Sequence, residues 1–145
     1  MKIYVLSGAS EAGKTNTLHT LALLLNSMPA KYRFLTGVSA PLPQALPISF
    51  DQQYVFEQVG TGRKIGISTG GDTASVIDNG FDFFVQNGCD VGFIASKSIG
   101  ASIDQIEKRS FPCIIPMYFW LISSTTKRTQ TQIQTDVAQQ LELMI

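Results

Sequence analysis

Short apolar runs recur along the chain, separated by segments in which apolar residues follow helical spacing. The runs cover residues 2–7, 64–68, 91–95 and 113–121, and they are rich in β-branched and aromatic residues. Runs of this length without a regular polar face are typical of strands that are buried on both sides in a parallel sheet. We therefore predict these four runs as the core strands of one sheet.

Three segments have the periodicity of amphipathic helices, and the first of them covers residues 14–28. Their apolar positions recur every three or four residues: Leu18, Leu21, Ala22 and Leu25; Ala74, Ile77, Phe81, Phe84 and Val85; and Ile133, Val137, Leu141 and Met144. A further helix carrying Ile103 and Ile106 is expected to be capped by Ser98 or Ser102. Residues 123–132 are polar and are predicted to form a loop.

Glycine and proline mark the connections between these elements. Residues 54–59 alternate polar and apolar side chains before Gly60-Thr61-Gly62, which predicts a β-hairpin with the strand at 64–68. Residues 29–50 are rich in proline, and apart from a brief strand at 32–35 they are predicted to be a loop. This loop is either an exposed connection or a flap over a ligand.

Alternating strands and helices predict the fold class. Buried strands that bear no polar face need helices on both sides, so we predict a three-layer α/β fold with a mostly parallel sheet. No repeat or composition boundary divides the chain, so residues 1–145 are expected to form a single domain.

Composition narrows the partners and the compartment. The formal net charge is zero, which argues against a nucleic-acid partner bound mainly by charge and leaves a homodimer or a protein partner open. The apolar run at 111–122 contains two prolines and is far shorter than the roughly 20 residues needed to span a membrane. Cys89 and Cys113 lie in apolar surroundings, where reduced buried thiols are expected. These features predict a cytoplasmic protein without a membrane partner.

Residues 8–15 carry specific chemistry, because they match the Walker A pattern G-x-x-x-x-G-K-T between a predicted strand and a predicted helix. In such a loop the backbone N–H groups point towards a phosphate at the start of the helix. Lys14 can reach the β- and γ-phosphates, and the Thr15 hydroxyl suits Mg²⁺. The predicted nucleotide-binding residues are Gly8, Ala9, Ser10, Glu11, Ala12, Gly13, Lys14, Thr15 and Asn16.

On these residues the chain resembles the P-loop NTPase superfamily, which implies a P-loop NTPase fold and a nucleoside triphosphate bound with Mg²⁺. Over its whole length it also resembles a group of small, stand-alone bacterial and phage-type ATP-binding proteins. The Walker A loop, residues 65–73, and Cys89-Asp90 leading into 91–97 carry this second resemblance, which implies no settled reaction. The guanine-reading Asn-Lys-x-Asp motif is missing from the sequence, so ATP is favoured over GTP.

A second acidic metal ligand is expected at the carboxyl end of another strand. Asp72 is the best candidate, because it follows the strand at 64–68 after a short glycine turn. We therefore predict Lys14 and Asp72 as catalytic residues and Thr15 and Asp72 as metal ligands. The alternative is that Asp72 caps a helix beginning near Thr73. Lys97 ends a predicted strand at the same edge, where it either contacts a phosphate or an acceptor or is a solvated lysine.

The sequence is compatible with three functions. The first is Mg²⁺-dependent binding and hydrolysis of a nucleoside triphosphate, which needs only the loop, the metal and a positioned water. The second is a small-molecule or nucleotide kinase. The third is a nucleotide-sensing partner protein without turnover.

Overall fold

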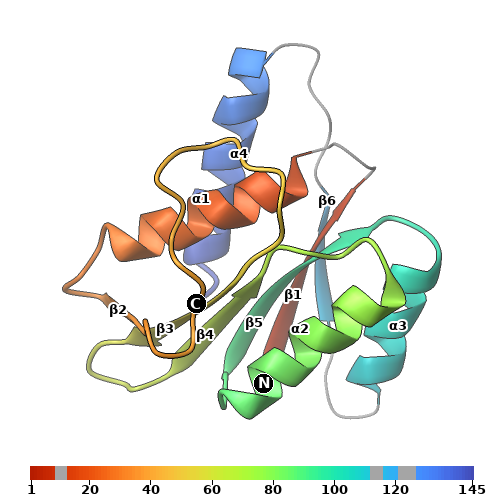
Figure 1. The fold of residues 1–145 in the computed structure, drawn as a ribbon, viewed down its shortest axis with the longest axis horizontal. Helices are drawn as coiled ribbons and strands as arrows, with labels where there is room; N and C mark the ends of the chain where they lie inside the picture. The colour runs from red at the N-terminus through yellow and green to blue at the C-terminus, as the bar shows by residue number, and fades with distance from the viewer. Residues whose placement is uncertain (9–12, 112–115, 121–126) are drawn as a thin grey trace.

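The computed structural model describes residues 1–8, 13–111, 116–120 and 127–145. Within these residues a six-stranded sheet is covered by four helices (Figure 1). The elements, in chain order, are β1 (Lys2–Gly8), α1 (Lys14–Asn26), β2 (Tyr32–Phe34), β3 (Gln53–Gln58), β4 (Lys64–Ser68), α2 (Ala74–Gln86), β5 (Val91–Lys97), α3 (Ala101–Ser110), β6 (Pro116–Trp120) and α4 (Lys127–Glu142).

The strand order is β2-β3-β4-β5-β1-β6. Strands β4, β5, β1 and β6 run parallel, whereas β3 is antiparallel to both β2 and β4. The α/β class, the mostly parallel sheet and the predicted hairpin are therefore confirmed. The core strands predicted at 2–7, 64–68 and 91–95 are confirmed as well. Of the strand predicted at 113–121, residues 116–120 form β6, and 113–115 and 121 lie outside the described residues.

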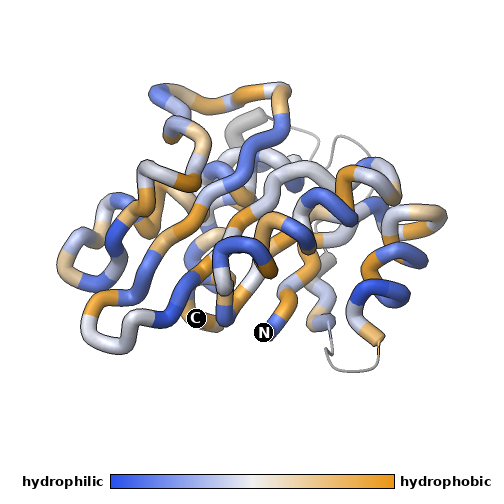
Figure 2. The backbone as a smooth tube through the Cα atoms, turned by 60° about the horizontal axis from the view of Figure 1, so that its bottom comes forward, coloured by the Kyte–Doolittle hydropathy of each residue, from blue (hydrophilic) through white to orange (hydrophobic). Residues whose placement is uncertain are grey.

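Helices cover both faces of the sheet. Tyr4 and Leu6 of β1 point into a core formed with α1 and α4, whereas Ile3 and Val5 point into a second core formed with α2 and α3. Figure 2 shows hydrophobic and hydrophilic residues alternating along the helices, as expected when one side of each is buried. Among the described residues, none of the helices combines the length and the apolar character required to cross a bilayer.

The buried face of α2 differs in part from the prediction. Ile77, Phe81 and Phe84 are buried as expected, but Val85 is 65% exposed, so its assignment to this face was wrong. The Phe84 ring occupies the space above Gly66 and Gly92, where a Cβ would come within 2.4 Å and 2.7 Å of it. Because this ring fixes the rotation of α2 on the sheet, the next residue is turned outward.

Two helix starts also differ from the prediction. The N-cap of α3 is Gly100, and Ser102 lies inside the helix, where its hydroxyl accepts a hydrogen bond from the Lys97 N–H at 3.2 Å. Helix α4 begins at Lys127, so the predicted loop at 123–132 is wrong for 127–132. The first turns of α4 carry no apolar residue before Ile133, and this is why its start is not visible in the pattern.

Candidate functional site

The carboxyl ends of β1, β4 and β5 meet at one edge of the sheet. Gly8 at the end of β1 is in register with Lys97 at the end of β5, and Ser68 at the end of β4 is in register with Ile94. Helix α1 starts at the same edge. In open α/β sheets this is the edge at which ligands bind.

The structure describes five of the nine predicted loop residues: Gly8, Gly13, Lys14, Thr15 and Asn16. Ala9, Ser10, Glu11 and Ala12 lie outside the described residues. Gly13 is the N-cap of α1 and has a φ of 89°, a left-handed conformation that favours glycine. A Cβ at Gly13 would lie 2.2 Å from the Nε2 atom of Gln134 and 2.8 Å from that of Gln130. Helix α4 therefore packs directly against the end of the loop.

Lys14 is a buried cation at the start of α1. The residue is 6% exposed, and its Nζ donates a hydrogen bond to the Gly8 carbonyl at 3.0 Å. Burial lowers the pKa of Lys14, the nearby Asp72 carboxylate opposes this shift, and Lys97 adds to it. Lys14 thus lies close to one acidic and one basic side chain from the other two strand ends.

The turn at residues 69–72 is tied to both of its neighbours. The Thr15 hydroxyl donates to the Thr69 carbonyl at 3.3 Å, which joins α1 to the turn. The Gln52 N–H donates to the Thr69 hydroxyl at 2.8 Å, and the Thr69 N–H donates to the Gln52 carbonyl at 3.0 Å, so the turn is also tied to the residue before β3. At Gly71 a Cβ would come within 1.9 Å of the Ala95 carbonyl oxygen, so the turn lies against the backbone of β5.

Asp72 does not cap α2. The N-cap is Thr73, whose hydroxyl accepts a hydrogen bond from the Val76 N–H at 3.3 Å, so the capping interpretation of Asp72 is wrong. Asp72 instead borders the same cavity as Lys14 and Thr15. Its carboxylate is therefore positioned by the turn and not by a role in the helix.

The proline-rich loop runs across α1 to this edge of the sheet (Figure 1). The Ile48 N–H donates to the Asn16 side-chain oxygen at 2.9 Å, and the Phe50 carbonyl lies 3.3 Å from Nε2 of His19. His19 is fully buried, and burial lowers its pKa, which keeps the ring neutral. A neutral ring can donate from Nε2 to Phe50 and accept from the Tyr54 hydroxyl at Nδ1, 2.9 Å away. Two side chains of α1 thus hold the loop against the helix at this edge of the sheet.

The structure adds a second carboxylate, Asp51, which the sequence analysis did not identify. Burial raises the pKa of Asp51, and the Asp72 charge raises it further, so the two carboxylates lie close to one another. Both border the same cavity. A usable signal was present, because β3 is antiparallel to β4 and its first residue, Gln53, must lie beside the last residue of β4, Ser68.

These groups surround a cavity of about 810 Å³, within the size range of small-molecule and cofactor sites. Its lining residues are Gly13, Lys14, Thr15, Asn16, Pro47, Ile48, Ser49, Phe50, Asp51, Thr69, Gly71, Asp72 and Ala95. In the described part of the chain, no group of three or more His, Cys, Asp or Glu side chains is placed to hold a metal ion. A metal held by Asp72 and the Thr15 hydroxyl would take further oxygen ligands from a bound molecule or from water.

Fold and cavity define an α/β protein with a cavity lined by charged side chains at the carboxyl edge of a mostly parallel sheet. Comparisons with protein families, with curated proteins and with solved structures gave no match.

Proposed function

We propose that this cavity binds a nucleoside triphosphate with Mg²⁺, that ATP is preferred, and that the protein is a P-loop NTPase that hydrolyses it. The observation that carries the proposal is the composition of one cavity. Lys14, the Thr15 hydroxyl and the carboxylates of Asp51 and Asp72 border it together, at the start of a helix.

The phosphates would lie beside Gly13, Lys14 and Thr15. A helix start favours negative charge, and the Lys14 ammonium adds a point charge at the same place. Mg²⁺ would neutralise part of the phosphate charge, with Thr15 and Asp72 as its protein ligands. This arrangement supports the P-loop NTPase fold as well, since the loop joins the end of β1 to the start of α1.

Hydrolysis needs a water molecule directed at the terminal phosphate. Asp51 is the group that suits this task, since a carboxylate can accept hydrogen bonds from water and take up a proton. It is a second acidic side chain on the same cavity and lies two residues before the start of β3. The segment 47–51, held by Asn16 and His19, would cover the bound nucleotide and limit the access of other water.

Calorimetric titration with ATP and Mg²⁺ tests the binding step. Lys14→Ala should weaken ATP binding by about 10-fold to 100-fold, because a hydrogen bond to a charged group contributes about 1.5–3 kcal/mol. Lys108→Ala is the matched control, since Lys108 is an exposed lysine on α3, away from the cavity lining. Equal affinity of the Lys14→Ala variant and the parent would exclude the assignment.

An assay of phosphate release and ADP formation distinguishes the three candidate functions. Release from ATP in water alone supports hydrolysis, whereas ADP formation that depends on an added nucleoside, nucleotide or small-molecule acceptor indicates a kinase. Tight binding without turnover indicates a nucleotide sensor.

A further inference from the structure

A second cavity lies next to the one described above. Its volume is about 640 Å³. Ser68 and Gly70 line the second cavity, whereas Thr69 and Gly71 line the first, so the segment 68–71 separates the two. Asp51 borders both cavities and therefore lies at their junction.

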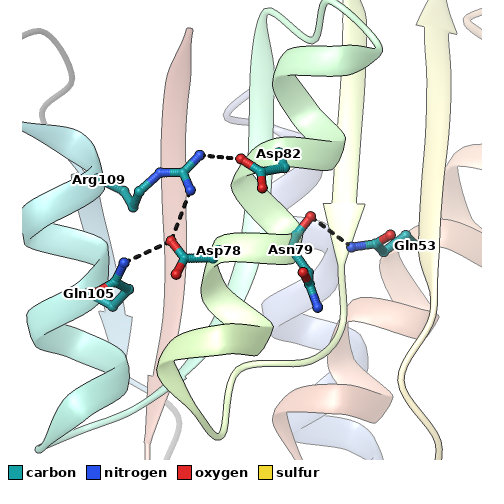
Figure 3. A network of polar contacts seen from close by, with 6 residues as sticks. All are labelled: Gln53, Asp78, Asn79, Asp82, Gln105 and Arg109. Carbon is teal, nitrogen blue, oxygen red and sulfur yellow. Dashed lines mark hydrogen bonds and ion pairs between the residues drawn. The ribbon is translucent and has the colours of Figure 1, made fainter.

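The walls of the second cavity are rich in side-chain amides. Gln53 on β3 and Asn79 and Gln86 on α2 line it, and the Gln53 side chain donates to the Asn79 carbonyl at 3.3 Å, which joins the two elements (Figure 3). Asn79 and Gln86 are exposed, and their side-chain amides form no hydrogen bond with any other described residue, so they are open to solvent and to a ligand. These amides can donate to and accept from a ligand that carries hydroxyl or amine groups.

The charged groups of this cavity are all acidic. Asp51 and Asp82 line it, and among the described residues no Lys, Arg or His does. Arg109 approaches from α3, but its guanidinium is bonded to Asp82 at 2.6 Å and to Asp78 at 2.9 Å (Figure 3). A phosphate or carboxylate in the cavity would therefore face the Asp51 carboxylate and the group of Asp78, Asp82 and Arg109, whose net charge is negative, which acts against anionic ligands.

Apolar surface is present beside these polar groups. Val76 and Phe83 of α2 contribute to the lining. Cavities of this size that combine apolar side chains with a few polar groups are typical small-molecule sites.

We propose that the second cavity binds a small, neutral or cationic molecule that carries several hydroxyl or amine groups and no phosphate or carboxylate. Val76 and Phe83 contact its carbon skeleton, the amides of Asn79 and Gln86 bond its polar groups, and Asp51 contacts the part nearest the first cavity. Binding at this site does not require that a nucleotide is bound.

NMR detection of side-chain amides tests the proposal directly. The ¹⁵N-labelled protein is titrated with glucosamine, glucose and adenosine, and separately with their phosphorylated counterparts glucosamine 6-phosphate, glucose 6-phosphate and adenosine monophosphate. Each titration is made with and without Mg²⁺ and ADP. At least one phosphate-free probe should shift the amide signals of Gln53, Asn79 and Gln86. Its phosphorylated counterpart should bind about tenfold more weakly or worse, because its added charges meet the Asp51 carboxylate and the net negative charge shared by Asp78, Asp82 and Arg109.

Variants of α2 confirm the location. Asn79→Trp, or Gln86→Trp if the first does not fold, fills the cavity and should abolish the shifts. Val85→Trp is the matched control, because Val85 is an exposed residue of the same helix outside the lining. The proposal is wrong if no probe shifts the three amides, if phosphorylated probes bind equally well, or if binding persists in the filled variant. Failure of nucleotide binding would be visible separately, as missing shifts of the Gly13 and Thr15 backbone signals on addition of Mg²⁺ and ADP.

Discussion

One methyl group at Gly71 should displace the turn that positions Asp72. A Cβ there would lie 1.9 Å from the Ala95 oxygen and 2.2 Å from the Ala95 carbonyl carbon. Ordinary contacts between carbon atoms are about 3.5–4.0 Å, so the turn or the strand must move by more than about 1 Å in Gly71→Ala. The obstructing atoms belong to the backbone of β5, which is paired with β4 on one side and β1 on the other, so the turn is the part that yields.

The loss of stability expected for Gly71→Ala follows from these short contacts. Overpacking a well-packed interior destabilises by about 1–3 kcal/mol, and each kcal/mol lowers the Tm of a chain of this length by about 2–4 °C. Gly71→Ala should therefore lower the Tm by several degrees. It should also weaken Mg²⁺-dependent ATP binding, because Asp72 follows directly and moves with the turn.

Two other glycines provide graded controls. At Gly70 a Cβ would meet the ends of the Val76 and Asp51 side chains at 2.7 Å and 2.8 Å. Because these side chains can rotate away, Gly70→Ala should destabilise the protein less than Gly71→Ala. At Gly37 a Cβ meets nothing within 4 Å, so Gly37→Ala should stabilise by about 0.4–1 kcal/mol through the unfolded chain.

Urea denaturation is the assay, with the midpoint and the m value fitted for all three variants. The order of stability should be Gly37→Ala, then Gly70→Ala, then Gly71→Ala, with an unchanged m value. If Gly71→Ala is as stable as Gly37→Ala, the turn does not lie against β5 as described, and the placement of Asp72 loses its support.

Two further predictions concern single ionisable side chains. Asp72→Asn should change the free energy of unfolding by less than about 0.5 kcal/mol, because Thr73 and not Asp72 caps α2. The same variant should reduce the Mg²⁺ dependence of ATP binding measured by calorimetry. An unchanged dependence would remove Asp72 from the proposed metal site. His19 has a lowered pKa in the folded protein, so the unfolded chain takes up its proton first and stability should fall as the pH drops below about 6.5, with a slope of up to about 1.4 kcal/mol per pH unit. Urea midpoints at about pH 7.5 and about pH 5.5 should show this loss, and the part due to His19 should be missing in His19→Gln.

The sequence predicts the sheet well, because its strands are buried on both faces. Residues 91–95 are an apolar run without a regular polar face, and residues 65–68 are buried although only Ile65 and Ile67 are large apolar side chains; the two segments form parallel neighbouring strands. The residue pattern predicted the helices less accurately, because each helix has a side that is exposed to solvent. The polar start of α4 resembles a loop, and Val85 continues an apolar sequence while pointing outward, since the rotation of α2 is fixed by Phe84 above two glycines.

Some residues of the candidate site could be predicted from the sequence and others could not. The spacing of Gly8, Gly13, Lys14 and Thr15 is local, so the sequence alone predicts that these residues share a turn between a strand and a helix. Asp51 joins them only because β3 runs antiparallel to β4 and because the proline-rich loop crosses α1. The hairpin of β3 and β4 is visible in the sequence, but the path of the proline-rich loop across α1 depends on contacts between distant segments, which residue spacing does not encode. The adjacency of Asp51 and Asp72 is therefore a property of the topology.

The charges of the first cavity narrow the kind of ligand that suits it. Lys14 is a buried ammonium, and Asp51 and Asp72 are carboxylates close enough for Asp72 to raise the pKa of Asp51. An anion bound alone would gain from Lys14 but would face both carboxylates, and a cation bound alone would face Lys14 at the start of a helix. A ligand that carries phosphate oxygens and a bound divalent cation matches both kinds of group at once, with the phosphates towards Lys14 and the metal towards the carboxylates. In the proposed complex the bound cation would oppose the effect of the Asp72 charge on Asp51, which in the free protein adds to the burial that raises the pKa of Asp51.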